Sequence, residues 1–221
     1  MSGVLCVWLS LMGCNSTSGG SGESRPGEGK GATQSVTDRD PTAAAGRGLR
    51  ALKAELSEGA GGTHALSGQE ISDLALGDPL PEFLIRLDSL QSYRGGDPHR
   101  LLVDLAKRTY PVTGNGDIAL SLITVSETRE GWHVSTISDI AGPGPAKVLK
   151  RRDGAQSTML VRIPALMNLT FVGYSMSGKL FLRPLMDQRS LRLKRAWEYP
   201  ADSLLQALAR AAIRYDEDVP R

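Results

Sequence analysis

Cysteine is almost absent from this chain. Its 221 residues include two cysteines, Cys6 and Cys14, and both lie near the N-terminus. The remainder therefore has neither a free thiol nor a disulfide, although a domain of this length can form a core without one. Histidine is also scarce, with only His64, His99 and His133. Because zinc and iron–sulfur sites need clustered cysteines and histidines, we expect no metal site and no cofactor.

Motifs of known catalytic mechanisms are missing as well. The nearest approach to a Gly-x-Ser-x-Gly nucleophile elbow, residues 173–178, has the wrong spacing and fits a tight turn better. The Gly-Lys dipeptide that closes this stretch lacks the upstream glycines of a phosphate-binding loop. We therefore expect a binding or structural protein rather than an enzyme. The alternative is a hydrolase-like enzyme whose dispersed site pairs His133 with Asp139 or Asp117.

A long apolar run is also lacking at the N-terminus. The run of residues 4–12 fits the roughly 7–15 residues of an export signal but not the roughly 20 that span a membrane. It is followed by the small residue Gly13. Residues 11–14, Leu-Met-Gly-Cys, resemble the lipobox of bacterial lipoproteins.

That resemblance implies a signal peptide, residues 1–13, and a mature chain that begins at Cys14 with lipid on its sulfur and its new amino group. It also implies a place in the bacterial cell envelope, at the outer membrane or the periplasmic face, with a membrane as partner through the lipid anchor. The alternative interpretation is a buried N-terminal strand with an incidental cysteine.

The segment that follows, residues 14–48, is dominated by Gly, Ser, Thr, Pro and scattered charges. Such a composition cannot bury enough apolar surface to offset the entropy of ordering, so we expect a disordered linker. A tether directly behind a lipidated cysteine would let a domain stand off its membrane. Composition alone also fits an ordinary disordered N-terminus.

The rest of the chain divides into a helical linker segment, residues 49–80, and a folded domain, residues 81–216. In the linker, helical spacing predicts helices over residues 49–56 and 66–76. In the domain we expect strands over residues 82–87, 117–126, 132–137, 158–163, 169–174 and 179–184, and helices over residues 97–108, 146–152 and 201–215. This order predicts an α+β fold: one mainly antiparallel sheet of about five to six strands with flanking helices, preceded by a disordered tether.

The clearest local signal in the domain is a β-hairpin formed by residues 117–126 and 132–137. Ile118, Leu120 and Leu122 alternate along its first strand and predict one buried face. The same alternation places His133 opposite the buried positions, facing solvent.

Residues 81–139 are also similar in general character to uncharacterised exported proteins of bacteria. The resemblance depends on short motifs: Arg86-Leu87-Asp88, residues 101–104, residues 110–112, and Gly131-Trp132 at the hairpin. It carries no activity over to this chain.

Positive charge is concentrated in one region. The whole chain has a formal net charge of +2, but residues 141–195 hold eleven Lys or Arg against two Asp, a balance of 11 − 2 = +9. Two clusters within this region form a candidate contact for an anionic partner, namely Lys147, Lys150, Arg151, Arg152, Arg189, Arg192, Lys194 and Arg195. Such a patch fits an anionic glycan, anionic lipid or an acidic envelope protein. The alternative is a merely solvated face, and we expect no nucleic acid partner because no recognition motif is visible.

Overall fold

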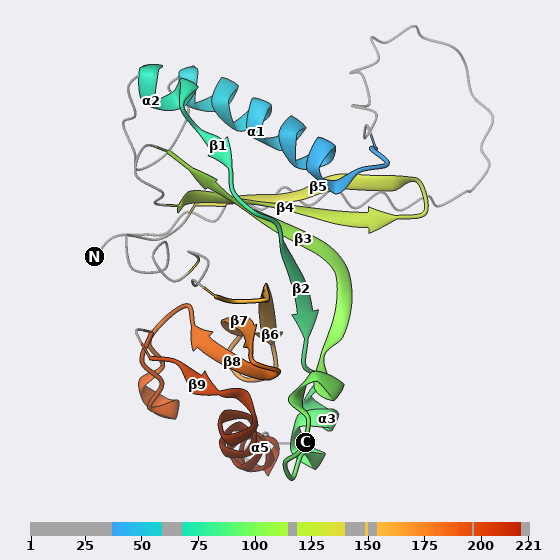
Figure 1. Cartoon of the computed structure of the whole chain (residues 1–221), viewed down its shortest axis with the longest axis vertical. Helices are drawn as coiled ribbons and strands as arrows, with labels where there is room; N and C mark the ends of the chain where they lie inside the picture. Colours follow the sequence, from blue (N-terminus) through green and yellow to red (C-terminus); the bar gives the residue numbers. More distant parts are fainter. Residues whose placement is uncertain are drawn as a thin grey trace, which may run out of the picture. The chain divides into compact units, whose positions relative to one another are not determined.

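A nine-stranded sheet is the main element of residues 37–58, 68–114, 119–139, 149, 154–195 and 197–217, which the computed structural model describes (Figure 1). All these residues belong to the second of the two units into which the chain divides, residues 35–221. The strands are β1 (Ala75–Leu76), β2 (Leu80–Leu84), β3 (Val103–Thr113), β4 (Ala119–Thr128), β5 (Gly131–Asp139), β6 (Ser157–Ile163), β7 (Leu169–Met176), β8 (Lys179–Pro184) and β9 (Tyr199–Pro200).

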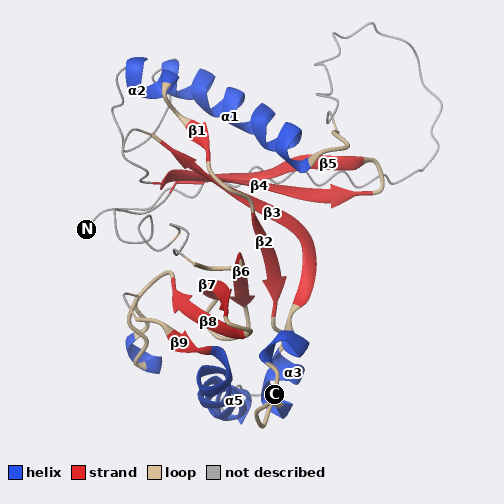
Figure 2. Ribbon diagram, viewed as in Figure 1, coloured by secondary structure: helices blue, strands red, loops and turns tan. Residues whose placement is uncertain are grey.

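The strand order in the sheet is β5-β4-β3-β2-β6-β7-β8-β9, and β1 pairs separately with β3. All pairings between the described strands are antiparallel except that of β2 with β6, which is parallel. Figure 2 shows the red strands joined through β2 and β6 with blue helices beside them. The predicted α+β class and the mainly antiparallel sheet with flanking helices are therefore confirmed.

Two tight turns explain why the sequence forms its hairpins. The turn between β4 and β5 has two residues, since Thr128 pairs with Gly131. Gly131 has a φ of +126°, and an added Cβ would lie 2.5 Å from the carbonyl oxygen of Asp38, so only glycine fits there. In the turn between β7 and β8, Ser177 and Gly178 have φ values of +51° and +75°. These are the conformations that favour a two-residue hairpin loop.

Helix α1 (Pro41–Ser57) packs on β3, β4 and β5. Asp40 caps its first turn by accepting hydrogen bonds from the amides of Thr42 and Ala43, both at 3.2 Å. An added Cβ at Gly48 would lie 2.9 Å from the Ile123 side chain, so the helix approaches the sheet closely. The core beneath the helix is formed by Ala44, Ala45, Leu52, Leu74, Tyr110, Val112, Ile123, Val125 and Trp132.

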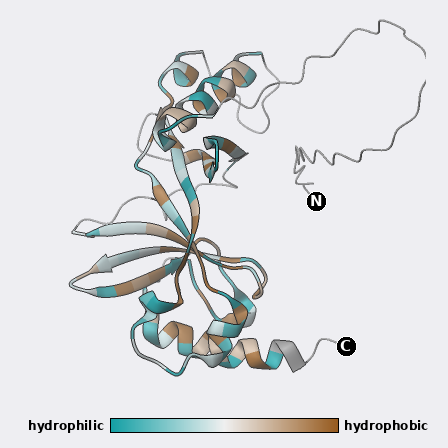
Figure 3. Ribbon diagram, turned by 90° about the vertical axis from the view of Figure 1, so that its right-hand side faces the viewer, coloured by the Kyte–Doolittle hydropathy of each residue, from teal (hydrophilic) through white to brown (hydrophobic). Residues whose placement is uncertain are grey.

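The largest group of buried apolar residues lies at the other end of the sheet, where α3 (Leu87–Ser92) and α5 (Ala201–Glu217) cover β6, β7 and β8. Apolar and polar bands alternate along α5, as its amphipathic sequence requires (Figure 3). Its buried side includes Leu204, Leu205 and Leu208, which pack against strand residues such as Phe171 and Leu182. The remaining helices are short: α2 (Gly68–Ser72), η1 (Pro98–Leu101) and η2 (Arg189–Leu191).

The sheet has more strands than the five to six that the sequence predicts, for two reasons. Strands β1 and β9 contain two residues each, too few to produce a period. Strand β3 replaces the second half of a predicted helix over residues 97–108. Asp97 does cap a helical turn, with its carboxylate 3.0 Å from the His99 amide, but the turn ends at Leu101. Pairing with β2 and β4 then outweighs the helical spacing of the leucines.

The hairpin itself is confirmed, but its predicted buried face is wrong. Ile123 and Val125 are the deepest side chains of β4, whereas Leu120 and Leu122 are half-buried. The buried face differs from the predicted one because α1, which the sequence pattern places in a linker outside the domain, covers the Ile123 side. His133 is half-buried rather than solvent-facing, and its Nδ1 atom is enclosed. Ile118 lies outside the described residues.

The helix α1 also begins earlier than the sequence predicts, at Pro41 rather than at residue 49, within the stretch expected to be a disordered linker. The Asp40-Pro41 pair starts it, since proline fits the first helical position. Helix α2 is shorter than predicted and covers only part of residues 66–76. Helix α5 agrees with the prediction, and the expected helix over residues 146–152 lies outside the described residues apart from Leu149.

A hydrogen bond between Tyr93 and Asp202 joins the end of α3 to the start of α5. The Tyr93 hydroxyl donates to Asp202 Oδ1 at 2.7 Å and lies 3.0 Å from the carbonyl oxygen of Gly96. Burial, together with the adjacent carboxylate, raises the pKa of Tyr93. The hydrogen bonds from Tyr93 and Gln206 lower the pKa of Asp202.

These shifts predict how stability depends on pH. Because the folded state raises the pKa of Tyr93, its contribution is full below the ordinary tyrosine value of about 10 and is lost as pH rises beyond it. We expect Tyr93→Phe to lower Tm by roughly 2–4 °C at neutral pH. The gap between the two proteins should shrink above about pH 10. Thermal melts from neutral to alkaline pH measure this difference in Tm. A difference that stays constant with pH would contradict the link between Tyr93 ionisation and stability.

Candidate functional site

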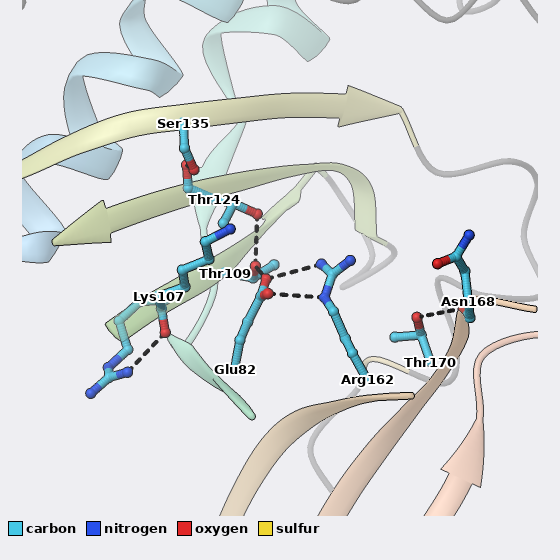
Figure 4. A network of polar contacts seen from close by, with 9 residues as sticks. Glu82, Lys107, Thr109, Thr124, Ser135, Arg162, Asn168 and Thr170 are labelled. Carbon is cyan, nitrogen blue, oxygen red and sulfur yellow. Dashed lines mark hydrogen bonds and ion pairs between the residues drawn. The ribbon is translucent and has the colours of Figure 1, made fainter. Parts of the chain in front are cut away.

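A row of polar side chains crosses four adjacent strands of the sheet (Figure 4). Glu82 on β2 is 1% exposed, and its carboxylate faces the guanidinium of Arg162 on β6. Arg162 Nη2 donates to Glu82 Oε1 at 3.1 Å, and Nε lies 2.9 Å from Oε2 as a close ion pair that is not aligned as a hydrogen bond. The Thr109 hydroxyl on β3 also donates to Glu82 Oε1, and it lies 2.8 Å from the Thr124 hydroxyl on β4.

This row is a structural feature rather than a reactive one. Glu82 is engaged from both sides, by Arg162 and by Thr109. The pair also sits at the parallel contact between β2 and β6, where Glu82 lies opposite Leu160. A buried carboxylate is stable only when paired and hydrogen-bonded, and Arg162 supplies the compensating charge. Neither residue is predicted from the sequence; the signal is a single charge within each strand, Glu82 in β2 and Arg162 in β6.

His133 lies on β5 opposite Ser126 on β4, and Asp139 lies six residues further along the same strand. At about 3.3 Å per residue, His133 and Asp139 are separated by roughly 20 Å. The structure therefore does not bring this predicted pair together, and Asp117 lies outside the described residues. His133 Nδ1 and the Ser126 hydroxyl are enclosed and find no hydrogen-bond partner among the described residues.

An open cleft of about 660 Å³ lies beside the link between β1 and β2. Its lining includes Leu76, Pro79, Pro111 and Leu149, with Asp78 the one carboxylate among the described lining residues. Neither His133 nor Asp139 reaches it. The cleft therefore does not supply the concave site that the enzymatic alternative requires.

Four of the predicted contact residues for an anionic partner lie together between β8 and β9, on residues 186–197, which we call the basic loop. Gln188 and Leu193 exchange two backbone hydrogen bonds of 2.9 Å across it. The Arg195 amide donates to Asp187 Oδ1 at 2.7 Å, and the Lys194 amide donates to the Tyr199 hydroxyl at 3.1 Å. The loop thus has a defined conformation, closed at its base.

The apolar residues of the basic loop point in two directions. Leu193 is buried in the core beneath α5, and Leu191 packs against that core. Met186 and Trp197, which flank the base, are instead 61% and 57% exposed. Lys194 Nζ lies 4.8 Å from the centre of the Trp197 ring system, a cation–π contact. No sequence pattern predicts the exposure of Met186 or Trp197.

The cations of the loop are displayed at its surface. Arg189, Arg192 and Lys194 are exposed, and Arg195 is half-buried. Arg192 adopts a left-handed conformation with φ of +55°, which closes the η2 turn. The other predicted residues, Lys147, Lys150, Arg151 and Arg152, lie outside the described residues, as does the predicted lipidation residue Cys14.

Comparison of the chain with protein-family models, curated proteins and solved structures finds no match. The function must therefore be argued from the chain itself. Across the described ranges, no group of three or more His, Cys, Asp or Glu side chains could hold a metal ion. Within the same part of the chain, no helix is both long and apolar enough to cross a bilayer.

Proposed function

We propose that this protein is a lipid-anchored protein of the bacterial cell envelope, attached through Cys14, whose domain binds an anionic partner rather than catalysing a reaction. The observation that carries the proposal is the basic loop, because it holds exposed cations on a backbone fixed to the core. The lipobox resemblance of residues 11–14 supports the anchor and a location at the outer membrane or periplasmic face.

The chain between the anchor and α1 supports this arrangement. Residues 14–37 precede Asp38, which bridges to Trp132; they number 24 (37 − 14 + 1) and have the Gly- and Ser-rich composition of a flexible tether. A flexible chain of this length has an end-to-end distance of roughly 30 Å, from about 5–6 Å multiplied by the square root of its length. The domain would then remain within reach of the membrane that carries the lipid.

Mass spectrometry of the N-terminus tests the anchor. Expressed in a bacterium, the native chain should lose residues 1–13 and carry lipid on Cys14, because the signal is read as a lipobox. Cys14→Ser should remain unlipidated and leave the membrane fraction. The matched control is Cys6→Ser, which changes the other cysteine and should not affect lipidation. An intact, unmodified native chain would remove the anchor from the proposal.

The enzymatic alternative around His133 has less support. Two enclosed atoms without a hydrogen-bond partner in the described part of the chain, His133 Nδ1 and the Ser126 hydroxyl oxygen, are the observations in its favour. A histidine acts as a general base when another group orients it and substrate can reach it. Asp139 is too distant to orient it, and the described cleft lies elsewhere. The geometry therefore favours binding through the basic loop.

A further inference from the structure

We propose that the partner of the basic loop is the surface of an anionic phospholipid bilayer, with Trp197 and Met186 entering the headgroup region and the neighbouring cations meeting lipid phosphates. This inference rests on the proposed function, in which the loop is the anionic contact. It names the partner that the sequence left open among glycan, lipid and envelope protein.

The charge of the loop fits such a surface. Residues 186–197 contain four basic side chains and one acidic one, a balance of 4 − 1 = +3. The acidic residue is Asp187, whose Oδ1 accepts a hydrogen bond from the Arg195 amide and so closes the base of the loop. Arg189, Arg192 and Lys194 are exposed and form no ion pair with a described carboxylate. Cations held near an anionic bilayer are strongly attracted to it over about one Debye length.

The exposed apolar side chains beside these cations favour a bilayer as the partner. Met186 and Trp197 are the two most exposed large apolar residues of the described chain. Both flank the base of the loop in the chain: Met186 precedes Asp187, whose Oδ1 accepts a hydrogen bond from the Arg195 amide, and the Trp197 amide donates to the Lys194 carbonyl at 3.0 Å. Tryptophan prefers the membrane–water interface, where its ring is half in an apolar layer and its N–H remains hydrated.

The same contacts argue against a glycan or a protein partner. Lys194 lies over one face of the Trp197 indole, which reduces the aromatic surface on which a sugar ring could stack. The loop's one carboxylate, which could accept hydrogen bonds from sugar hydroxyls, is held by the Arg195 amide. A stable protein interface needs about 800 Å² on each side with a desolvated centre. Two apolar side chains set among exposed cations fit a headgroup layer better.

The fold presents this surface ready to bind. Leu193 fixes the loop to the core, and the Gln188–Leu193 hydrogen bonds hold its two sides together. Little backbone entropy is then lost on docking. A lipid anchor at Cys14 and the basic loop would act on the same membrane.

Vesicle sedimentation tests the proposal with the full chain carrying Cys14→Ser, so that no lipid anchor contributes. Vesicles containing about one-third phosphatidylglycerol are compared with pure phosphatidylcholine vesicles at low salt. The triple variant Arg189→Gln, Arg192→Gln, Lys194→Gln should bind roughly 100-fold more weakly, from about fivefold for each cation removed. The matched control, Lys179→Gln, Arg210→Gln, Arg214→Gln, removes the same charge elsewhere and should keep its affinity. All the compared proteins contain residues 1–13, so any contribution of that apolar run to vesicle binding cancels in the comparison.

Trp197 supplies a second readout that overall charge would not affect. On binding, brominated lipids should quench a fluorescence component that Trp197→Phe lacks, and Trp197→Ala should weaken binding several-fold. Equal loss of binding in the loop variant and the matched control would overturn the proposal. So would binding to a soluble polyanionic glycan without binding to vesicles. If mass spectrometry finds lipid on Cys14 but vesicles do not bind, this inference fails while the anchor stands; the opposite result removes the anchor alone.

Discussion

Replacing Arg162 by methionine is expected to lower the free energy of unfolding by about 3–5 kcal/mol, because it leaves the carboxylate of Glu82 buried without a compensating charge. The Glu82 side chain is 2% exposed, whereas that of Arg162 is 43% exposed. The two partners of the ion pair therefore differ in their access to solvent. Glu82→Met should cost less, since the guanidinium that remains can reach solvent. Urea denaturation of the two variants measures the difference.

The double variant Glu82→Met, Arg162→Met is the control for this interpretation. With no charge left to bury, it should recover most of the stability lost in Arg162→Met. Thr109 and Thr124 would still hydrogen-bond to each other, at their present 2.8 Å. Arg210→Met makes the same chemical change on the exposed side of α5 and should have little effect. A double variant as unstable as Arg162→Met would show that packing, and not charge, explains the loss.

Truncating Leu52 to alanine is expected to lower the free energy of unfolding by about 2–5 kcal/mol. Leu52 is 7% exposed and belongs to the core that α1 forms with β3, β4 and β5. The near-ultraviolet signal of Trp132, which lies in the same core, should be lost in the same transition as the rest of the fold. Denaturant unfolding followed by both signals provides the measurement.

The matched control for Leu52→Ala is Glu55→Ala, one turn further along the exposed side of α1, which should change stability little. This pair decides between two interpretations of residues 49–57. A loosely docked linker would tolerate either substitution equally, whereas a helix of the domain core would not. Equal, small effects would restore the linker interpretation of this segment.

Local chemistry explains which elements could be predicted. The β4–β5 and β7–β8 hairpins follow from two-residue turns, with Gly131 directly after the first turn and Gly178 within the second, both at a positive φ. The cap formed by Asp40 and Pro41 is equally local, but the alanine- and glycine-rich residues behind it resemble a linker in composition. The start of α1 was missed because its burial depends on β4, which lies far along the chain.

Non-local pairing explains the elements and contacts that the sequence does not predict. Leucines near residue 102 have helical spacing, yet β3 forms because β2 and β4 provide partners on both sides. The Glu82–Arg162 pair joins residues 80 positions apart (162 − 82), which no local pattern can indicate. For the candidate site, the sequence identified the cations of the basic loop from charge alone. It could not show that Leu193 would be buried while Trp197 remained exposed.

The parallel contact between β2 and β6 has a consequence for the order of assembly. Strands β3, β4 and β5 pair with neighbours close in the chain, and so do β6, β7 and β8. The β2–β6 register, in which Glu82 lies opposite Leu160, closes a loop of 78 residues (160 − 82). Closing such a loop costs conformational entropy before any of its contacts form. The pairing of β2 with β6 is therefore expected to form last. The newly synthesised chain would then carry two half-sheets, each with an open edge, until β2 and β6 pair.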